Sequence, residues 1–159
     1  MLRGHLIHPP ILEALAGAGH GSRVLIADGN YPVSTTRGPN AKLVHLNLAP
    51  GLIDGAAVLG ALLTVLPVES ASVMDAPTGG GQPKPAIWED YAKALQEVGV
   101  HELERLSRRD FYLAARGEDV AIVIATGETR LYANLLLTIG VVAGESAHIN
   151  DQNRDVTLP

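Results

Sequence analysis

The feature that most limits the possible folds of this chain is a repeated alternation of short apolar runs with segments of helical spacing. Apolar runs of this length are typical of buried strands, whereas longer segments with apolar positions three and four apart are typical of helices. The run RVLIA at 23–27 is followed at once by turn residues, so it predicts a buried strand with Asp28 at its carboxyl end. Strands that alternate with helices predict an α/β fold, a single layered α/β/α domain around a largely parallel central sheet.

The same patterns predict the other elements of this domain. Helices are expected at 10–18, 52–66, 86–98 and 110–116, and further strands at 43–48, 70–74, 102–106, 120–126 and 131–139. Beyond Val142 the sequence loses its periodicity and becomes polar. We therefore expect one domain over 1–142 and a polar C-terminal tail over 143–159.

Composition excludes several classes of function. The formal net charge is −5 and the 12 Lys and Arg residues are scattered, which argues against the basic face that nucleic-acid binding needs. The chain has no cysteine, so disulfides and thiolate metal sites are excluded. It has no apolar run of the roughly 20 residues that span a bilayer, and its first residues lack a signal-peptide pattern. We expect a cytoplasmic protein with no membrane or nucleic-acid partner.

Glycine and histidine patterns argue against nucleotides, metals and cofactors. The stretch GAGHG at 17–21 follows a predicted helix and precedes a predicted strand, whereas a dinucleotide fingerprint follows a strand and opens a helix. The six histidines show no paired ligand spacing. His20 differs from the others because small residues surround it and leave room for a ligand. An imidazole can give and take a proton near neutral pH, although a loop histidine is more often solvated or capping.

Two further positions are candidates for binding a small polar molecule. Asp28 lies where open α/β sheets bind ligands, although an Asp-Gly pair is also a common turn. Tyr132 and Asn134 lie two apart on the predicted strand 131–139, so their side chains should share one face. A ligand with hydroxyl groups would satisfy such a polar pair, and so would ordinary buried hydrogen bonds.

Three segments together resemble the RbsD/FucU family, which contains fucose mutarotase and ribose pyranase. They are GAGHGSRVLIADGNYP at 17–32, RRDFY at 108–112 and TGETRLYANLLLTIGVV at 126–142, and the resemblance spans about residues 1–142. It implies an RbsD-like fold and an isomerase that interconverts ring forms of a free monosaccharide by acid–base catalysis, with no metal and no cofactor.

The resemblance also implies roles for individual residues. His20 and Tyr132 would be catalytic, and Asp28, Arg108, Tyr132 and Asn134 would hold the sugar. Arg109 is adjacent and could take the place of Arg108. The family further implies a ring-like homo-oligomer, a pentamer or decamer, with sites at subunit boundaries.

Within the family, the turn Asp-Gly-Asn-Tyr-Pro at 28–32 and the arginine at 108 are closer to the fucose branch. Gly29 stands where an alanine is expected, and 117–119 resembles a short insertion. The expected substrate is therefore L-fucose or a similar sugar. A D-ribose pyranase and a non-catalytic sugar-binding accessory of an uptake system remain alternatives, and a nucleotide-dependent enzyme is disfavoured by the misplaced glycine pattern.

Overall fold

A computed structural model describes residues 2–77 and 83–142 of the chain. The predicted tail at 143–159 lies outside these residues, as do residues 78–82. The described residues form the helices α1 (Pro9–Ala16), α2 (Gly55–Leu63), α3 (Ile87–Gln96) and α4 (Arg108–Ala115). They also form the strands β1 (Arg23–Ala27), β2 (Lys42–His45), β3 (Val68–Met74), β4 (Leu103–Leu106), β5 (Val120–Ala125) and β6 (Leu135–Ile139).

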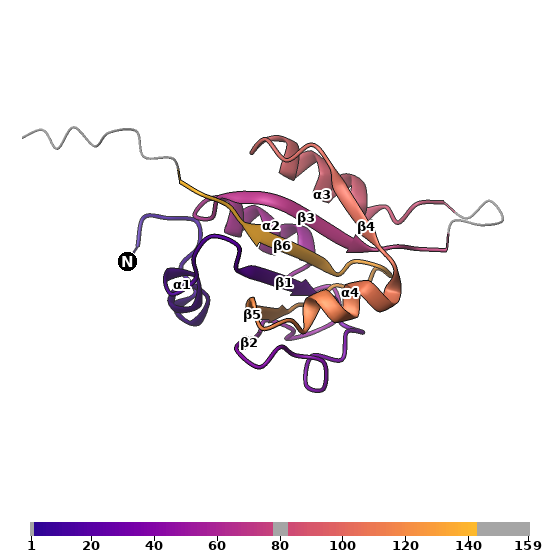
Figure 1. Ribbon diagram of the computed structural model, residues 1–159, viewed down its shortest axis with the longest axis horizontal. Coiled ribbons are helices and arrows are strands. Elements are labelled where there is room, and N and C mark those ends of the chain that lie inside the picture. Colours follow the sequence, from indigo (N-terminus) through magenta and orange to yellow (C-terminus); the bar gives the residue numbers. More distant parts are fainter. Residues whose placement is uncertain (1, 78–82, 143–159) are drawn as a thin grey trace, which may run out of the picture.

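All of these strands belong to one sheet, in the order β2-β5-β1-β6-β3-β4 (Figure 1). Strand β1 is parallel to β5, β5 to β2, and β3 to β4. Strand β6 lies between β1 and β3 and is antiparallel to both. The largely parallel central sheet predicted from the sequence is therefore confirmed, with β6 as its reversed strand.

Both faces of the sheet are covered by helices, which confirms the layered α/β/α fold. Successive residues of β1 point to opposite faces: Val24 and Ile26 pack with α1, α2 and α3, whereas Leu25 and Ala27 pack with α4. Figure 1 shows α4 in front of the sheet and α2 behind it. Because β1 is buried on both faces after Arg23, its residues from Val24 to Ala27 are all apolar rather than alternating. None of the helices in the described part of the chain is long and apolar enough to cross a membrane.

Two predicted element starts differ clearly from the structure, and the strand from 43 and the helix from 52 also end earlier than predicted, at His45 and Leu63. The helix predicted from residue 52 begins at Gly55, because Asp54 caps it by accepting a hydrogen bond from the Ala57 N–H at 2.8 Å. The strand predicted from residue 131 begins at Leu135. Tyr132 has a φ of 59°, in the left-handed region, and this backbone conformation cannot continue a strand. The argument that Tyr132 and Asn134 share a strand face therefore fails, although the two residues still meet at one cavity.

Candidate functional site

The candidate site lies at the carboxyl end of β1, where the buried Asp28 and Asn134 hold each other. The Asp28 N–H donates to Oδ1 of Asn134 at 2.9 Å, and Nδ2 of Asn134 donates to Oδ2 of Asp28 at 2.8 Å. The other carboxylate oxygen of Asp28 accepts a bond from the Asn30 N–H at 2.9 Å. These bonds join the end of β1 to the start of β6, so the two side chains have one fixed orientation.

The acidity of Asp28 follows from this environment. Burial raises its pKa, because the charged form loses water, and the nearby charge of Glu128 acts in the same direction. Backbone N–H groups of Asn30, Ala133 and Tyr31 oppose the rise, but the pKa remains above the usual aspartate value. A carboxyl group whose pKa is shifted toward neutral pH is better suited to proton transfer than an ordinary surface aspartate.

A cavity of about 170 Å³ opens beside Asp28 and brings together four of the residues predicted from the sequence. Asp28, Arg108, Tyr132 and Asn134 all line it, whereas Arg109 does not. Arg108 is the first residue of α4, whose N-cap Ser107 accepts a hydrogen bond from the Asp110 N–H at 3.1 Å. The start of α4 thus places a guanidinium at the rim of the cavity.

Sequence reasoning missed an aromatic wall of this cavity. Tyr31 and Tyr112 line it and are stacked, with their ring centroids 5.4 Å apart and an angle of 13° between the planes. The guanidinium carbon of Arg108 lies 5.8 Å from the centroid of Tyr112. Both tyrosines fall within the segments that carry the family resemblance, so the signal was present without a stated role. The cavity therefore combines flat apolar surfaces with a few fixed polar groups, which is typical of small-molecule sites.

His20 is not at this cavity. The Gly21 N–H donates to the carbonyl of Ile139 at 2.9 Å, so His20 lies beside the far end of β6, while Asn134 precedes its start. At about 3.4 Å per residue, five strand residues separate these ends by roughly 17 Å. The exposed His20 ring instead contacts Glu69, with Nε2 2.9 Å from Oε2. Within one chain, the structure does not bring His20 to the other predicted site residues.

An ion pair between the buried Glu128 and the partly exposed Arg130, which the sequence did not reveal, supports the loop between β5 and β6. Glu128 is only 2% exposed and accepts bonds from Arg130 Nε and Nη2 at 2.9 and 2.8 Å. It also accepts a bond from the Gly55 N–H at 3.2 Å, which joins the loop to the start of α2. The only signal in the sequence was the Gly-Glu pair within the segment of family resemblance.

The pKa of Glu128 reflects a balance that favours its charged form. Burial alone would raise this pKa, but hydrogen bonds from the Arg130 side chain and from the N–H groups of Arg130 and Gly55 outweigh that effect. The pKa is therefore lowered from 4.5 to about 2. The stabilisation that results is fully present above about pH 4.5 and is lost as the pH falls toward about 2.

Replacing Glu128 with Gln is expected to lower the free energy of unfolding at pH 7 by about 2–3 kcal/mol. A fall of the pKa from 4.5 to about 2 corresponds to roughly 3.5 kcal/mol, and solvent around the partly exposed Arg130 reduces this value. Urea unfolding measured at pH 7, 4.5 and 3 checks this. The variant should also lose less stability than the wild type between pH 4.5 and 3. Glu13→Gln, which removes an exposed partner of Lys42, is the matched control and should change stability little. Equal acid sensitivity of wild type and E128Q would contradict the prediction.

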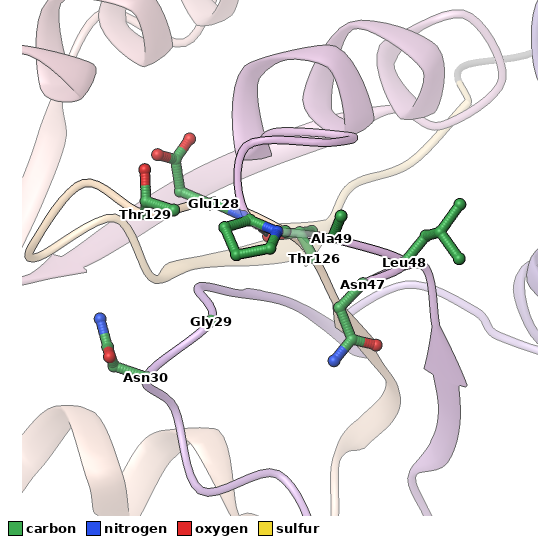
Figure 2. A pocket seen from close by; sticks show the side chains of 10 residues that line it. Gly29, Asn30, Asn47, Leu48, Ala49, Thr126, Glu128 and Thr129 are labelled. Carbon is green, nitrogen blue, oxygen red and sulfur yellow. Dashed lines mark hydrogen bonds between the residues drawn. The ribbon is translucent and has the colours of Figure 1, made fainter.

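A second cavity, of about 380 Å³, lies next to the first at the ends of β1, β2 and β5. Asn30 lines both cavities, and Figure 2 shows Asn30 and Asn47 on opposite sides of the larger one. A Cβ at Gly29 would lie 3.1 Å from the carbonyl oxygen of Glu128, so the unexpected glycine fits a close approach of these two backbone segments. Among the described residues no group of three or more His, Asp or Glu side chains is placed to hold a metal ion.

Comparison with known proteins gives consistent matches over most of the chain. The RbsD / FucU transport protein family matches residues 1–142. A human fucose mutarotase is 32% identical over 146 residues, covering 87% of this chain and 91% of the human protein. A D-ribose pyranase of Paracidovorax citrulli is 32% identical over 142 residues, covering 89% of this chain and 98% of that protein. The crystal structure of the fucose mutarotase from Streptococcus pneumoniae in complex with L-fucose is 31% identical, with a TM-score of 0.72, and covers 86% of this chain and 94% of that one.

Proposed function

This chain belongs to the RbsD / FucU transport protein family, and we propose that it catalyses the mutarotation of L-fucose or a close analogue at the cavity beside Asp28. Its matches to fucose mutarotases and D-ribose pyranases make it a sugar isomerase that interconverts anomers or ring forms. The observation that carries the choice of site is the convergence of Asp28, Arg108, Tyr132 and Asn134 on one cavity. We further propose a cytoplasmic location, with residues 1–142 as the catalytic domain.

The cavity offers groups that suit a neutral sugar. Asp28 keeps free lone pairs to accept sugar hydroxyls after bonding Asn30 and Asn134, and the guanidinium of Arg108 supplies donors. The stacked rings of Tyr31 and Tyr112 form a flat apolar surface against which the C–H groups of a sugar ring would pack. Hydrogen bonds would fix the orientation of the sugar, and the aromatic wall would exclude water from one side of it.

Mutarotation needs two coupled proton transfers. The anomeric hydroxyl loses its proton while the ring oxygen gains one, which breaks the bond between the anomeric carbon and the ring oxygen and gives the open-chain aldehyde. Rotation of the aldehyde followed by the reverse transfers closes the ring on the other face. Tyr132 in the cavity and His20 are our proposed proton-transferring groups, and the buried Asp28 binds the sugar and assists them. Atoms and electrons balance without an additional reactant.

His20 would reach this chemistry from a second copy of the chain. It lies at one end of the sheet and the cavity at the other, so the His20 end of one subunit would dock on the cavity end of the next. Both ends carry exposed apolar side chains: Leu48 is 82% exposed near the cavity end, and Val142, which follows β6, is 76% exposed at the His20 end. Head-to-tail contacts of this kind close into a ring when the rotation between neighbouring subunits divides a full turn. We therefore propose a ring-like homo-oligomer, a pentamer or decamer.

Exchange NMR on monosaccharides tests the proposed function. Saturation of one anomeric proton should transfer to the other anomer faster in the presence of the protein than in buffer, with a larger effect for L-fucose than for D-ribose. The acceleration should persist after EDTA treatment. Loss of activity on chelation with recovery on added Zn²⁺ would contradict the mechanism. Sugar binding without faster exchange would favour the accessory role, and faster exchange of D-ribose alone would favour a pyranase.

A further inference from the structure

Three side chains of α3 contact the backbone or side chains of the loop that carries Tyr132 and Asn134. The indole N–H of Trp88 donates to the carbonyl of Tyr132 at 2.9 Å, and the hydroxyl of Tyr91 donates to the carbonyl of Ala133 at 2.7 Å. Asp90, between them in sequence, accepts a bond from Nη1 of Arg130 at 2.8 Å. The helix thus holds the carbonyls of Tyr132 and Ala133 and the side chain of Arg130.

The loop needs such support because Tyr132 adopts a conformation that tyrosine normally avoids. Its φ of 59° brings the Cβ close to the backbone, at a cost that persists only when neighbouring groups hold the residue in place. Release of the two carbonyls would let Tyr132 relax toward the ordinary region of φ and would turn its ring relative to Asp28. Asn134, whose side-chain oxygen and nitrogen both bond to Asp28, would move together with Tyr132.

The fit of Tyr91 depends on a glycine in another helix. Gly55 is the first residue of α2, and a Cβ at this position would overlap the hydroxyl oxygen of Tyr91. Tyr91 is fully buried, and its hydroxyl reaches Ala133 through the space that the missing side chain leaves. The hydrogen bond between Tyr91 of α3 and the loop therefore also depends on the glycine at the start of α2.

We propose that Trp88 and Tyr91 are positioning residues for the proposed reaction, which set the orientation of Tyr132 and Asn134 through the carbonyls of Tyr132 and Ala133. The proposal rests on the proposed function for its kinetic consequence, but its structural content is independent of which sugar binds. Neither residue lines the cavity, so neither is a catalytic residue.

Trp88→Phe and Tyr91→Phe each remove one hydrogen-bond donor and keep a large apolar ring in the core. Each variant is expected to lower kcat for sugar exchange about 10- to 100-fold, because small displacements of a reacting group are costly. KM should change by no more than about threefold, since Arg108 and the stacked rings of Tyr31 and Tyr112, which would also contact the sugar, belong to other elements. A merely structural role would instead leave kcat unchanged at temperatures well below the unfolding transition.

Gly55→Ala provides an independent way to displace the Tyr91 hydroxyl. Gly55→Ala alone should lower kcat as much as Tyr91→Phe does. In the double variant, where the hydroxyl is already absent, Gly55→Ala should lower kcat little further, so the two effects should not be additive. Leu95→Ala is the matched control: Leu95 is a buried residue of the same helix without a bond to the loop, and its loss creates a cavity worth roughly 2–5 kcal/mol of stability. L95A should keep the wild-type kcat despite being less stable.

Hydrogen–deuterium exchange separates failure of this proposal from failure of the proposed function. In Tyr91→Phe and Trp88→Phe, the Asp28 amide bonded to Asn134 should exchange at least about tenfold faster than in the wild type, whereas in L95A it should not. This measurement needs no catalytic activity. If the wild type accelerated no sugar exchange, the proposed function would be wrong. Faster amide exchange in the Tyr91→Phe and Trp88→Phe variants would still support the positioning role. Unchanged amide exchange together with unchanged kcat in both variants would overturn the proposal.

Discussion

Replacing His20 with alanine is expected to lower the rate of anomer exchange by on the order of 10²- to 10⁴-fold, which is the usual cost of losing a positioned acid–base group. Sugar affinity should fall by roughly tenfold or less, because the imidazole contributes one hydrogen bond worth about 0.5–1.5 kcal/mol. Because the His20 side chain is exposed, its removal should leave the fold of the subunit intact. Exchange NMR and sugar titration on the same sample measure the two quantities separately.

Uncatalysed mutarotation sets a floor, so the rate constant should come from the slope against enzyme concentration. Glu69→Gln is the matched control, because it removes the charge of the carboxylate that contacts His20 in a single chain without changing the imidazole. E69Q should keep most of the activity. Near-wild-type exchange by H20A would move the catalytic assignment to Tyr132 or Asp28, and joint loss of activity and sugar binding would identify His20 as a structural part of the interface.

Mixing two inactive variants should restore activity if sites form between subunits. His20→Ala removes the proton-transferring group at one end of the sheet, and Asp28→Asn alters the cavity at the other while keeping its volume. After random reassembly of equal amounts, about a quarter of the head-to-tail contacts would join an intact His20 to an intact Asp28. The mixture should then show about a quarter of the wild-type rate, whereas each variant alone stays near the buffer rate.

Light scattering before and after mixing shows whether assemblies form and exchange subunits. A particle of 16.7 kDa at micromolar concentration would indicate a monomer and would contradict the shared site. Recovery of activity should also require reassembly of the rings. Variants that are mixed without a dissociation step should therefore regain activity slowly. Assemblies that exchange subunits freely but stay inactive would show that His20 and Asp28 do not act together across a contact.

The order of elements was predictable because each depends on local apolar spacing. The strand RVLIA was placed correctly at 23–27, since it is buried on both faces and bounded by turn residues. The position of Asp28 at a cavity was predictable from the rule that ligands bind at the carboxyl ends of strands in α/β sheets. The RbsD/FucU family was also identified from three segments and was confirmed by the match over 1–142.

Features that depend on contacts between distant segments could not be predicted. The start of β6 was placed four residues early, because a left-handed tyrosine held from α3 has no signature in local spacing. The pairing of Glu128 with Arg130 and Gly55 joins a loop to a helix 73 residues away in sequence. The separation of His20 from Asp28, in contrast, follows from the predicted strand at 23–27, which lies between the two residues in sequence.

Strand β6 begins beside the cavity and finishes beside His20, so under the proposed assembly no isolated subunit holds a complete set of reacting groups. Catalysis would then follow mass action between subunits as well as between enzyme and sugar. Dilution below the dissociation constant of the ring would abolish turnover while each chain stayed folded. Specific activity would fall steeply at low concentration, and the cell could set the rate of sugar interconversion through the amount of protein it makes.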